Sequence, residues 1–357
     1  MSKVLLFGPL TPPLTGQAVA FTIVANSLPE QKKILIDTSK YKNPIINTFY
    51  SVFKVLFSFA FYKFSNIYFT SSRSKLGFIK DFLLLIMGLW FKKKIINHLH
   101  GADFKKFYGE SIFLKPLISY AYKGVNTSIV LLNIMKNQYD DFPKMKKVVV
   151  GNCYNQELEE CKNDFSKNNY QILFLSNLMY GKGIIDFLDA CFVLLGNNEE
   201  IKIKIAGKLM GDTFMRQKNI EKLFKEKYNQ LRGVYGERVE YLGIVKGYEK
   251  SKVLFESSIF VLPSFYPTEA YPISIIEAMR AGNAIVTTNH NYLPYIVKEK
   301  NGVIISPKSP NEIYSSVEKL INNLGQLKKI QRHNIKEAKH KYSQDRYISD
   351  IQQIILS

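Results

Sequence analysis

Two carboxylates eight positions apart, Glu269 and Glu277, are the residues of this chain best spaced for chemistry on a bound ligand. The segment that holds them, 267–282, reads Pro-Thr-Glu-Ala-Tyr-Pro-Ile-Ser-Ile-Ile-Glu-Ala-Met-Arg-Ala-Gly. A β-rich run at 259–262 precedes it, and Pro272 suits the first turn of a helix. The pattern therefore predicts that Glu269 lies on a loop and that Glu277 lies within a helix, beside an apolar stripe.

A loop and helix of this kind could hold both ends of a nucleotide-sugar. The free N–H groups at a helix start bind phosphate oxygen atoms. A carboxylate within the helix can accept hydrogen bonds from the hydroxyl groups of a sugar or a ribose. Spacing alone also fits an exposed loop glutamate and a helix glutamate in an ordinary salt bridge, so other parts of the chain must decide between the two interpretations.

Two further segments could contact a diphosphate. Lys182 ends a run at 172–183 that predicts a strand, a loop and a helix start, and a cation fixed there would offset charge on a departing diphosphate. A lysine before a helix is, however, more often a surface residue. A turn-rich loop at 8–16 ends in Gly16, which would let backbone N–H groups approach ligand oxygen atoms closely. The loop lacks the GxGxxG pattern, so a dinucleotide site is not indicated.

Together these segments resemble the motifs of the GT-B glycosyltransferases, in particular the large retaining family four (glycosyl transferases group one), in order along nearly the whole chain. The resemblance implies that Glu269 faces the donor sugar near the reacting carbon and that Glu277 binds the nucleotide ribose. It also implies that Lys182 neutralises the leaving diphosphate. The further donor-binding residues that it implies are Gly16, Asn177, Gly243, Ala270, Tyr271 and Pro272.

Several of these positions depart from the family's usual residues. Ala-Tyr-Pro at 270–272 stands in place of Gly-Phe-Gly, and its proline has no N–H to donate. Asn177 stands in place of an arginine; it can donate a hydrogen bond but carries no charge. Gly207 and Gly243 fit the turns that line the base pocket of the family, and they fit plain turns equally well.

His100 follows a predicted strand at 94–98 and should lie at its carboxyl end. The resemblance implies that His100 contacts the donor sugar or the acceptor, whereas His98, predicted to point to the other face of the strand, is expected to be structural. A zinc site would need a third ligand that this pattern does not supply. We expect no metal and no cofactor beyond the nucleotide diphosphate-sugar, which is a co-substrate. Asn152 resembles the end of the family's first domain.

Strands and helices are predicted to alternate along the chain, which indicates parallel sheets covered on both faces. The expected fold class is α/β of the GT-B type, with two Rossmann-like, doubly wound, parallel-sheet domains facing a central cleft. A polar stretch at 157–169 is predicted to link them. The expected divisions are 1–165 for an acceptor-binding domain, 166–342 for a nucleotide-sugar-binding domain, and 343–357 for a terminal helix that packs back on the first domain.

The composition favours a folded protein of the cytoplasm. Apolar residues make up 46% of the 357, which argues against disorder. The three cysteines, an odd number without paired spacing, indicate a reducing compartment, and the first thirteen residues lack the features of a signal peptide.

The net charge of +19 is concentrated in the first half, where 21 Lys or Arg against 7 Asp or Glu through Val150 give +14. Between 47 and 94 the basic residues alternate with aromatic and aliphatic ones, a mixture that favours an anionic membrane surface over a nucleic acid. The longest apolar run, 82–91, is too short to span a bilayer, so we expect peripheral binding on the cytoplasmic face. A buried helix with a solvated lysine flank is the open alternative.

We therefore expect a retaining, metal-independent transfer of a hexose from a nucleotide diphosphate-sugar, with UDP as the expected nucleotide, to a hydroxyl group of a glycan. The basic first half favours a lipid-linked acceptor, as in the assembly of bacterial surface polysaccharides such as O-antigen or capsule. Three alternatives stay open: a sugar-nucleotide epimerase of the same fold, a soluble glucan synthase, and a non-catalytic protein that binds a membrane or a nucleic acid.

Overall fold

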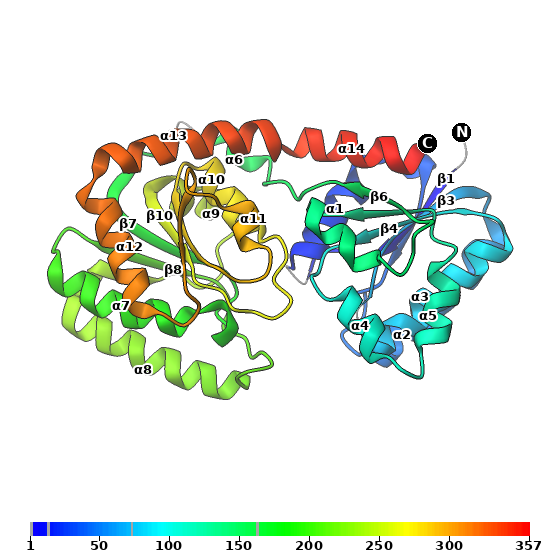
Figure 1. The fold of residues 1–357 in the computed structure, drawn as a ribbon, viewed down its shortest axis with the longest axis horizontal. Coiled ribbons are helices and arrows are strands. Elements are labelled where there is room, and N and C mark those ends of the chain that lie inside the picture. The colour runs from blue at the N-terminus through cyan, green and yellow to red at the C-terminus, as the bar shows by residue number, and fades with distance from the viewer. Residues whose placement is uncertain (1–2, 13–14, 73, 162–163) are drawn as a thin grey trace. The chain divides into compact units, whose positions relative to one another are not determined.

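The chain forms two compact units in the computed structural model, which describes residues 3–12, 15–72, 74–161 and 164–357. One unit comprises Met1–Asn152 with Asp345–Ser357, and the other comprises Cys153–Gln344. Residues 13 and 14, in the turn-rich loop before Gly16, lie outside the described residues. Figure 1 shows a sheet flanked by helices in each unit.

The first unit is built on a six-stranded parallel sheet in the order β2-β1-β3-β4-β5-β6. Its strands are β1 (Lys3–Gly8), β2 (Lys33–Asp37), β3 (Phe64–Thr70), β4 (Lys94–Leu99), β5 (Thr127–Val130) and β6 (Lys146–Val149). Its α-helices are α1 (Gly16–Ser27), α2 (Pro44–Phe61), α3 (Lys75–Trp90), α4 (Phe104–Glu110) and α5 (Lys115–Tyr122), with short 3₁₀ turns η1 (Glu30–Lys32) and η2 (Asn133–Tyr139). The central strands are buried along most of their length, as runs of apolar residues in a parallel sheet require.

The terminal helix, expected over 342–356, is α14 (Gln344–Leu356), and its residues from Asp345 onward belong to the first unit. Its apolar face, Tyr347, Ile351 and Ile355, is buried. Backbone groups tie the helix to the unit as well, since the Asn66 amide donates to the carbonyl oxygen of Ile355 at 2.7 Å.

The second unit holds a six-stranded parallel sheet in the order β12-β11-β10-β7-β8-β9. Its strands are β7 (Asn168–Leu175), β8 (Lys202–Ala206), β9 (Val239–Tyr241), β10 (Ser257–Leu262), β11 (Ala284–Thr288) and β12 (Gly302–Ile305). Its helices are α6 (Glu157–Glu160), α7 (Ile184–Asn197), α8 (Gln217–Tyr235), α9 (Gly247–Glu256), α10 (Ile273–Arg280), α11 (Leu293–Ile296), α12 (Pro310–Asn322) and α13 (Leu324–Lys341), with 3₁₀ turns η3 (Tyr180–Lys182) and η4 (Gly236–Arg238). The two parallel, helix-flanked sheets are those of the predicted α/β fold class.

The division between the units differs from the expected one at 165/166, since it falls between Asn152 and Cys153. The polar stretch predicted as a linker instead contributes α6 to the second unit. Within α6, Glu159 accepts two hydrogen bonds from the guanidinium of Arg280, at 2.8 and 2.6 Å. Glu159 is fixed by this partner, so the lack of apolar periodicity did not mark a free linker.

Helix α2 combines length and apolar composition in a way that would suit a membrane span, yet it packs against α3 and β2 of the first unit. Only 22% of the helix is buried. The longest apolar run of the sequence, 82–91, lies mostly in α3, whereas polar residues interrupt the apolar residues of α2.

Candidate active site

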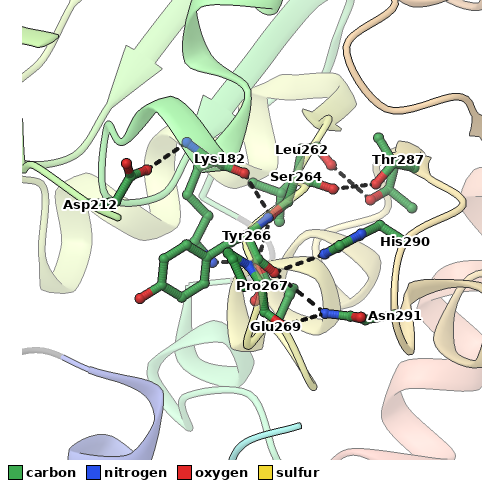
Figure 2. Close-up of polar contacts among 12 residues, drawn as sticks. Lys182, Asp212, Leu262, Ser264, Tyr266, Pro267, Glu269, Thr287, His290 and Asn291 are labelled. Carbon is green, nitrogen blue, oxygen red and sulfur yellow. Dashed lines mark hydrogen bonds and ion pairs between the residues drawn. The ribbon is translucent and has the colours of Figure 1, made fainter. Parts of the chain in front are cut away.

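Glu269 lies, as predicted, on the loop between β10 and α10. The side chain is only 6% exposed. Its Oε2 atom accepts a hydrogen bond from the Ser264 hydroxyl at 2.7 Å and forms an ion pair with the ammonium of Lys182. Figure 2 shows Lys182 and Ser264 converging on this carboxylate. A buried carboxylate needs such partners to remain charged.

Lys182 reaches Glu269 from the loop after β7, so the structure brings together two residues predicted from separate segments. The loop can approach β10 because the next residue is Gly183, with a φ of 76°; a Cβ atom there would lie 2.3 Å from the Pro263 carbonyl oxygen. The Lys182 ammonium also lies 5.2 Å from the centre of the Tyr266 ring. The cation is 14% exposed and is thus held in place, unlike an ordinary surface lysine.

Residues at the end of β11 hold the Glu269 loop through its backbone. Thr287 donates to the carbonyl oxygen of Leu262 at 2.7 Å, and Thr288 donates to that of Ser264. Farther along, His290 Nε2 lies 2.9 Å from the Tyr266 carbonyl oxygen, and the Asn291 amide donates to that of Pro267 at 2.9 Å (Figure 2). These bonds fix the path of the loop and hence the position of the carboxylate.

The loop after β8 contacts the turn that carries Lys182. Asp212 accepts a hydrogen bond from the Gly181 N–H at 2.6 Å, and its other carboxylate oxygen accepts from the N–H groups of Phe214 and Met215. The Gly181 carbonyl oxygen in turn accepts from the Phe265 N–H at 2.7 Å. The turn that carries Lys182 is therefore fastened on both sides.

Glu277 lies within α10, as predicted, and is 3% exposed. Its partner is Lys250 of α9, whose ammonium is 2.6 Å from Oε1. Lys250 was not predictable as this partner, because the two residues lie on different helices and share no spacing pattern. One turn later, Arg280 pairs with Glu159, and this guanidinium lowers the pKa of the Glu159 carboxyl to about 2.

The start of α10 follows Pro272, which occupies the N-cap position with extended backbone. Ala270 and Tyr271 are both buried. The Tyr271 ring lies 6.1 Å from the ring of Tyr342, and burial together with that neighbour raises the pKa of Tyr271 well above its usual range. Both side chains are therefore part of the packing around the helix start, and the first N–H groups of α10 are the polar groups that it can offer to an anion.

Gly207 and Gly243 tie the ends of β8 and β9 together. The Gly207 N–H donates to the Gly243 carbonyl oxygen at 2.7 Å. Gly207 has a φ of 141°, and a Cβ atom there would lie 1.7 Å from the Ser176 carbonyl oxygen, so only glycine fits. Asn177, in the loop after β7, is half-buried. Since β7, β8 and β9 are neighbours in one parallel sheet, these residues share its carboxyl edge with Lys182.

The other predicted residues belong to the first unit. Gly16 is the first residue of α1, where Thr15 caps the helix by accepting from the Ala18 N–H at 3.2 Å. Asn152, the last residue of this unit's first segment, is buried.

His100, directly after β4, is half-buried with its ring centre 4.0 Å from that of His98. His98 itself is buried with Nδ1 2.7 Å from the Tyr68 hydroxyl. Burial and the neighbouring imidazole lower the pKa of His98 well below its usual range, so it is neutral. The ring contact places His98 and His100 on the same side, so the prediction that they lie on opposite faces is wrong: side chains two positions apart along a strand share a face. The burial of His98 agrees with its expected structural role, and His100 is the histidine at the strand end.

Ser264, Lys250 and the residues after β11 were not singled out from the sequence. Ser264 could have been found, since it lies two residues after β10, where parallel sheets place their functional side chains. His290 and Asn291 follow β11 in the same way. Lys250 had no comparable signal.

Comparison with known proteins identifies a family most directly for the second unit. A family model described as "Glycosyl transferases group 1" matches residues 155–342, the stretch that contains Lys182, Glu269 and Glu277. Among curated proteins, a glycosyltransferase of Methanocaldococcus jannaschii is 32% identical over 175 residues, which is 49% of this chain and 41% of that protein. A second from the same organism is 25% identical over 257 residues, 72% of this chain and 66% of that protein. The chain thus matches less than two thirds of the length of either relative.

Solved structures resemble the chain along nearly its whole length. The complex of HepE from Anabaena with UDP superposes with a TM-score of 0.74 at 12% identity, covering 99% of both chains. Sucrose-phosphate synthase from Thermosynechococcus elongatus gives 0.72 at 12% identity, covering 99% of this chain and 98% of that one. A glycosyltransferase from Rickettsia africae gives 0.69 at 18% identity, with the same coverage. At these identities the likeness concerns the fold, and it confirms the predicted GT-B class.

Proposed function

We propose a sugar transfer for this chain, which belongs to the glycosyl transferases group 1 family: a sugar moves from a nucleotide diphosphate-sugar to a hydroxyl group of an acceptor. The observation that carries the proposal is the contact between Lys182 and Glu269, a fixed cation and a buried carboxylate that meet at the carboxyl edge of the second sheet. This transfer needs both charges, one for the leaving group and one for the sugar.

Lys182 would act on the leaving group. As the bond between the anomeric carbon and the diphosphate oxygen breaks, negative charge develops on the diphosphate, and the ammonium stabilises it. The N–H groups at the start of α10 would add to this stabilisation. In the structure the ammonium is bound to Glu269, so a bound diphosphate would draw Lys182 from one anion to another without leaving it unpaired.

Glu269 would face the sugar, where positive charge develops on the anomeric carbon. Ser264 and the backbone bonds from Thr288 and His290 hold this carboxylate without using a protein cation other than Lys182. Glu277 would accept hydrogen bonds from the ribose hydroxyl groups. Lys250 forms an ion pair with Glu277 and holds its carboxylate in place.

The proposed stereochemical course is retention. The acceptor oxygen forms its new bond to the anomeric carbon on the face that the diphosphate leaves, and the acceptor proton passes to the departing phosphate oxygen. No metal is needed for this scheme, because Lys182 and the helix N–H groups supply the positive charge. Asn177, Gly243 and residues 270–272 would line the donor site through backbone and amide groups.

The proposed donor is a UDP-sugar. The Anabaena protein HepE, whose fold this chain shares, was crystallised with UDP and with UDP-glucose. An E. coli protein of similar fold, with a TM-score of 0.70, was crystallised with UDP-2-fluoro glucose. These complexes are the reason to test uridine nucleotides first.

We assign acceptor binding to the first unit, with His100 at the sugar and Gly16 near the diphosphate. The acceptor that fits the charge of +14 over residues 1–150 is a glycan on an anionic lipid diphosphate, as in surface polysaccharide assembly on the cytoplasmic face of a membrane.

A donor screen with detection of the released nucleotide tests this proposal. Slow hydrolysis of one nucleotide-sugar, unaffected by a chelator and lost in Glu269→Gln, is expected. Interconversion of nucleotide-sugars without release of nucleotide would replace the transferase with an epimerase. Failure of every nucleotide diphosphate to raise the melting temperature would contradict the donor site itself.

A further inference from the structure

Helix α2 buries an unusual face. The residues directed toward the interior of the first unit are Asn47, Ser51, Val55 and Ser58, three of them polar. The hydroxyl groups of Ser51 and Ser58 donate to carbonyl oxygen atoms one turn earlier in the helix, at 2.8 and 2.7 Å. A surface helix of a water-soluble domain normally buries an apolar stripe instead.

The opposite face of α2 is exposed and apolar. Phe49 and Phe61 are each 71% exposed, and Phe53 is 62% exposed. The full set, here called the outer face of α2, is Ile45, Ile46, Phe49, Phe53, Leu56, Phe57 and Phe61. Most of the side chains that α2 buries are therefore polar, and its large apolar side chains are exposed. This is the reverse of the usual pattern in a surface helix of a water-soluble domain. A contiguous apolar surface of this kind marks contact with something other than water.

The stretch of sequence that contains α2 carries almost only positive charge. Between Asp37 and Asp103 the sequence contains one carboxylate, Asp81, and that residue is buried. Over the same stretch it contains ten basic residues: Lys40, Lys42, Lys54, Lys63, Arg73, Lys75, Lys80, Lys92, Lys93 and Lys94. Two of the lysines cover rings of α2, with the Lys40 ammonium 4.9 Å from the centre of Tyr50 and that of Lys54 5.8 Å from the centre of Phe57.

We propose that the outer face of α2 inserts into an anionic lipid bilayer, with the helix lying in the plane of the interface and the surrounding lysines bound to lipid phosphates. Apolar and aromatic residues on one face with lysines beside them are what an interfacial helix requires. The buried polar stripe and the packing on α3 and β2 keep α2 attached to its unit, so the helix lies on the membrane and does not cross it.

A second copy of the chain fits this surface less well. A two-fold symmetric contact would place the lysines of one copy against those of the other, with no exposed carboxylate from the same stretch to pair them. Lipid phosphates supply that missing negative charge. The link between this surface and a lipid-linked acceptor rests on the proposed function, whereas the insertion itself rests only on the exposure and charge of α2.

The chain carries its own reporter for the insertion. Trp90, its single tryptophan, lies at the end of α3 and is 71% exposed. The next residue, Phe91, contacts Phe59 of α2 with ring centres 5.2 Å apart. Insertion of α2 would therefore carry Trp90 into or near the headgroup layer and shift its emission to shorter wavelength.

The test uses the full chain with vesicles of phosphatidylcholine alone or mixed with phosphatidylglycerol. Flotation measures binding and Trp90 emission measures insertion. We expect binding to the mixed vesicles, a blue shift, partial retention in high salt, and release by an alkaline carbonate wash. The double variant Phe49→Glu with Phe53→Glu should bind at least tenfold more weakly. Val234→Glu, at a 69% exposed site on α8, should bind like wild type.

Four results would overturn the proposal. These are unchanged binding of the double variant, complete loss of wild-type binding in high salt, resistance to the carbonate wash, and a dimer in solution that dissociates in the double variant without any vesicle binding. Slow donor hydrolysis in the absence of lipid should be the same in wild type and both variants. That readout separates failure of the membrane surface from failure of the proposed sugar transfer.

Discussion

The two units differ in the partners that they provide for buried carboxyl groups. In the second unit the buried carboxylates Glu269 and Glu277 each pair with a lysine. In the first unit the buried Asp81 accepts hydrogen bonds from the backbone and hydroxyl of Ser72, and burial raises its pKa to about 7. Charge held in pairs at a sheet edge suits a charged ligand, since the ligand can exchange with one partner. A carboxyl that is partly neutral near pH 7 offers no such exchange.

The two units also differ in which residues their long helices bury. Helix α8 buries Ile220, Phe224 and Leu231 and exposes most of its charged residues, as expected for a helix in water. Helix α2 buries a mainly polar stripe and exposes aromatic residues. The two units thus share an architecture but differ in their surfaces: the second has a polar sheet edge, and the first has an exposed apolar face in a basic stretch of sequence.

The largest expected effect lies in the second unit. Lys182→Ala and Glu269→Gln should each lower kcat/KM by about 10³-fold, or about 4 kcal/mol, because each removes a charge that acts mainly in the transition state. Released nucleotide gives the measurement. The control is Lys105→Ala, which breaks an exposed ion pair with Asp140 in the first unit and should change kcat/KM less than twofold. A similar loss in this control would remove the contrast between the units.

Asp81 should make the first unit less stable as the pH rises. Its folded pKa of about 7 exceeds the usual aspartate value of 3.8, so the folded state binds the proton more tightly. The stabilisation is complete below about pH 4 and falls by up to about 4 kcal/mol as the pH rises to about 7. Asp81→Asn mimics the protonated form and should match wild type at low pH and exceed it at pH 8. Urea unfolding followed by Trp90 fluorescence checks this, and parallel pH profiles would contradict it.

Glu159 should give the second unit the opposite dependence. The Arg280 guanidinium lowers the pKa of Glu159 to about 2, below the usual glutamate value of 4.5. The stabilisation is present above about pH 4.5 and is lost by up to about 3 kcal/mol as the pH falls toward 2. Calorimetry at several acidic pH values should show this slope in wild type and its absence in Glu159→Gln. If the variant keeps the slope, other carboxyls cause it.

The sequence predicted the architecture and the central pair because both depend on local pattern. Apolar runs and turn residues marked most strands, and Lys182 and Glu269 each lie in the loop that follows such a run. Their contact also needed Gly183, whose left-handed backbone lets the two loops meet. The sequence pattern did not predict β12 or α9. These elements are short or rich in polar residues, so their apolar periodicity is weak.

Partners across helices were not predictable in this way. Lys250 and Glu277 come together only because α9 and α10 pack side by side. The pairing of Glu159 with Arg280 joins residues 121 positions apart and turned an expected linker into part of the second unit. The sequence also did not show that α2 buries polar residues and exposes apolar ones, since a count of apolar residues does not say which face of a helix is buried.

Glu277→Ala should weaken donor binding more than it slows the chemical step. The proposed ribose contacts exist in both the ground and transition states, so KM should rise by about 10- to 30-fold with kcat nearly unchanged. Steady-state kinetics with the donor varied gives both constants. Lys250→Met is the companion variant, and it should lower stability because it leaves Glu277 buried without its cation. A fall in kcat alone would place Glu277 at the reacting carbon instead.

The smallest effect concerns Ser264, which holds Glu269 without touching the ligand. Ser264→Ala should lower kcat by about tenfold, about 1.5 kcal/mol for one hydrogen bond to a charged group, and should leave KM unchanged. Ser264→Thr keeps the hydroxyl and should restore most of the activity. The matched control is Ser258→Ala on β10, whose buried Oγ has no hydrogen-bond partner among the described residues. Equal losses at both serines, with no rescue by threonine, would mean that Ser264 acts through packing, and the pairing of charge at this edge would then depend on Lys182 alone.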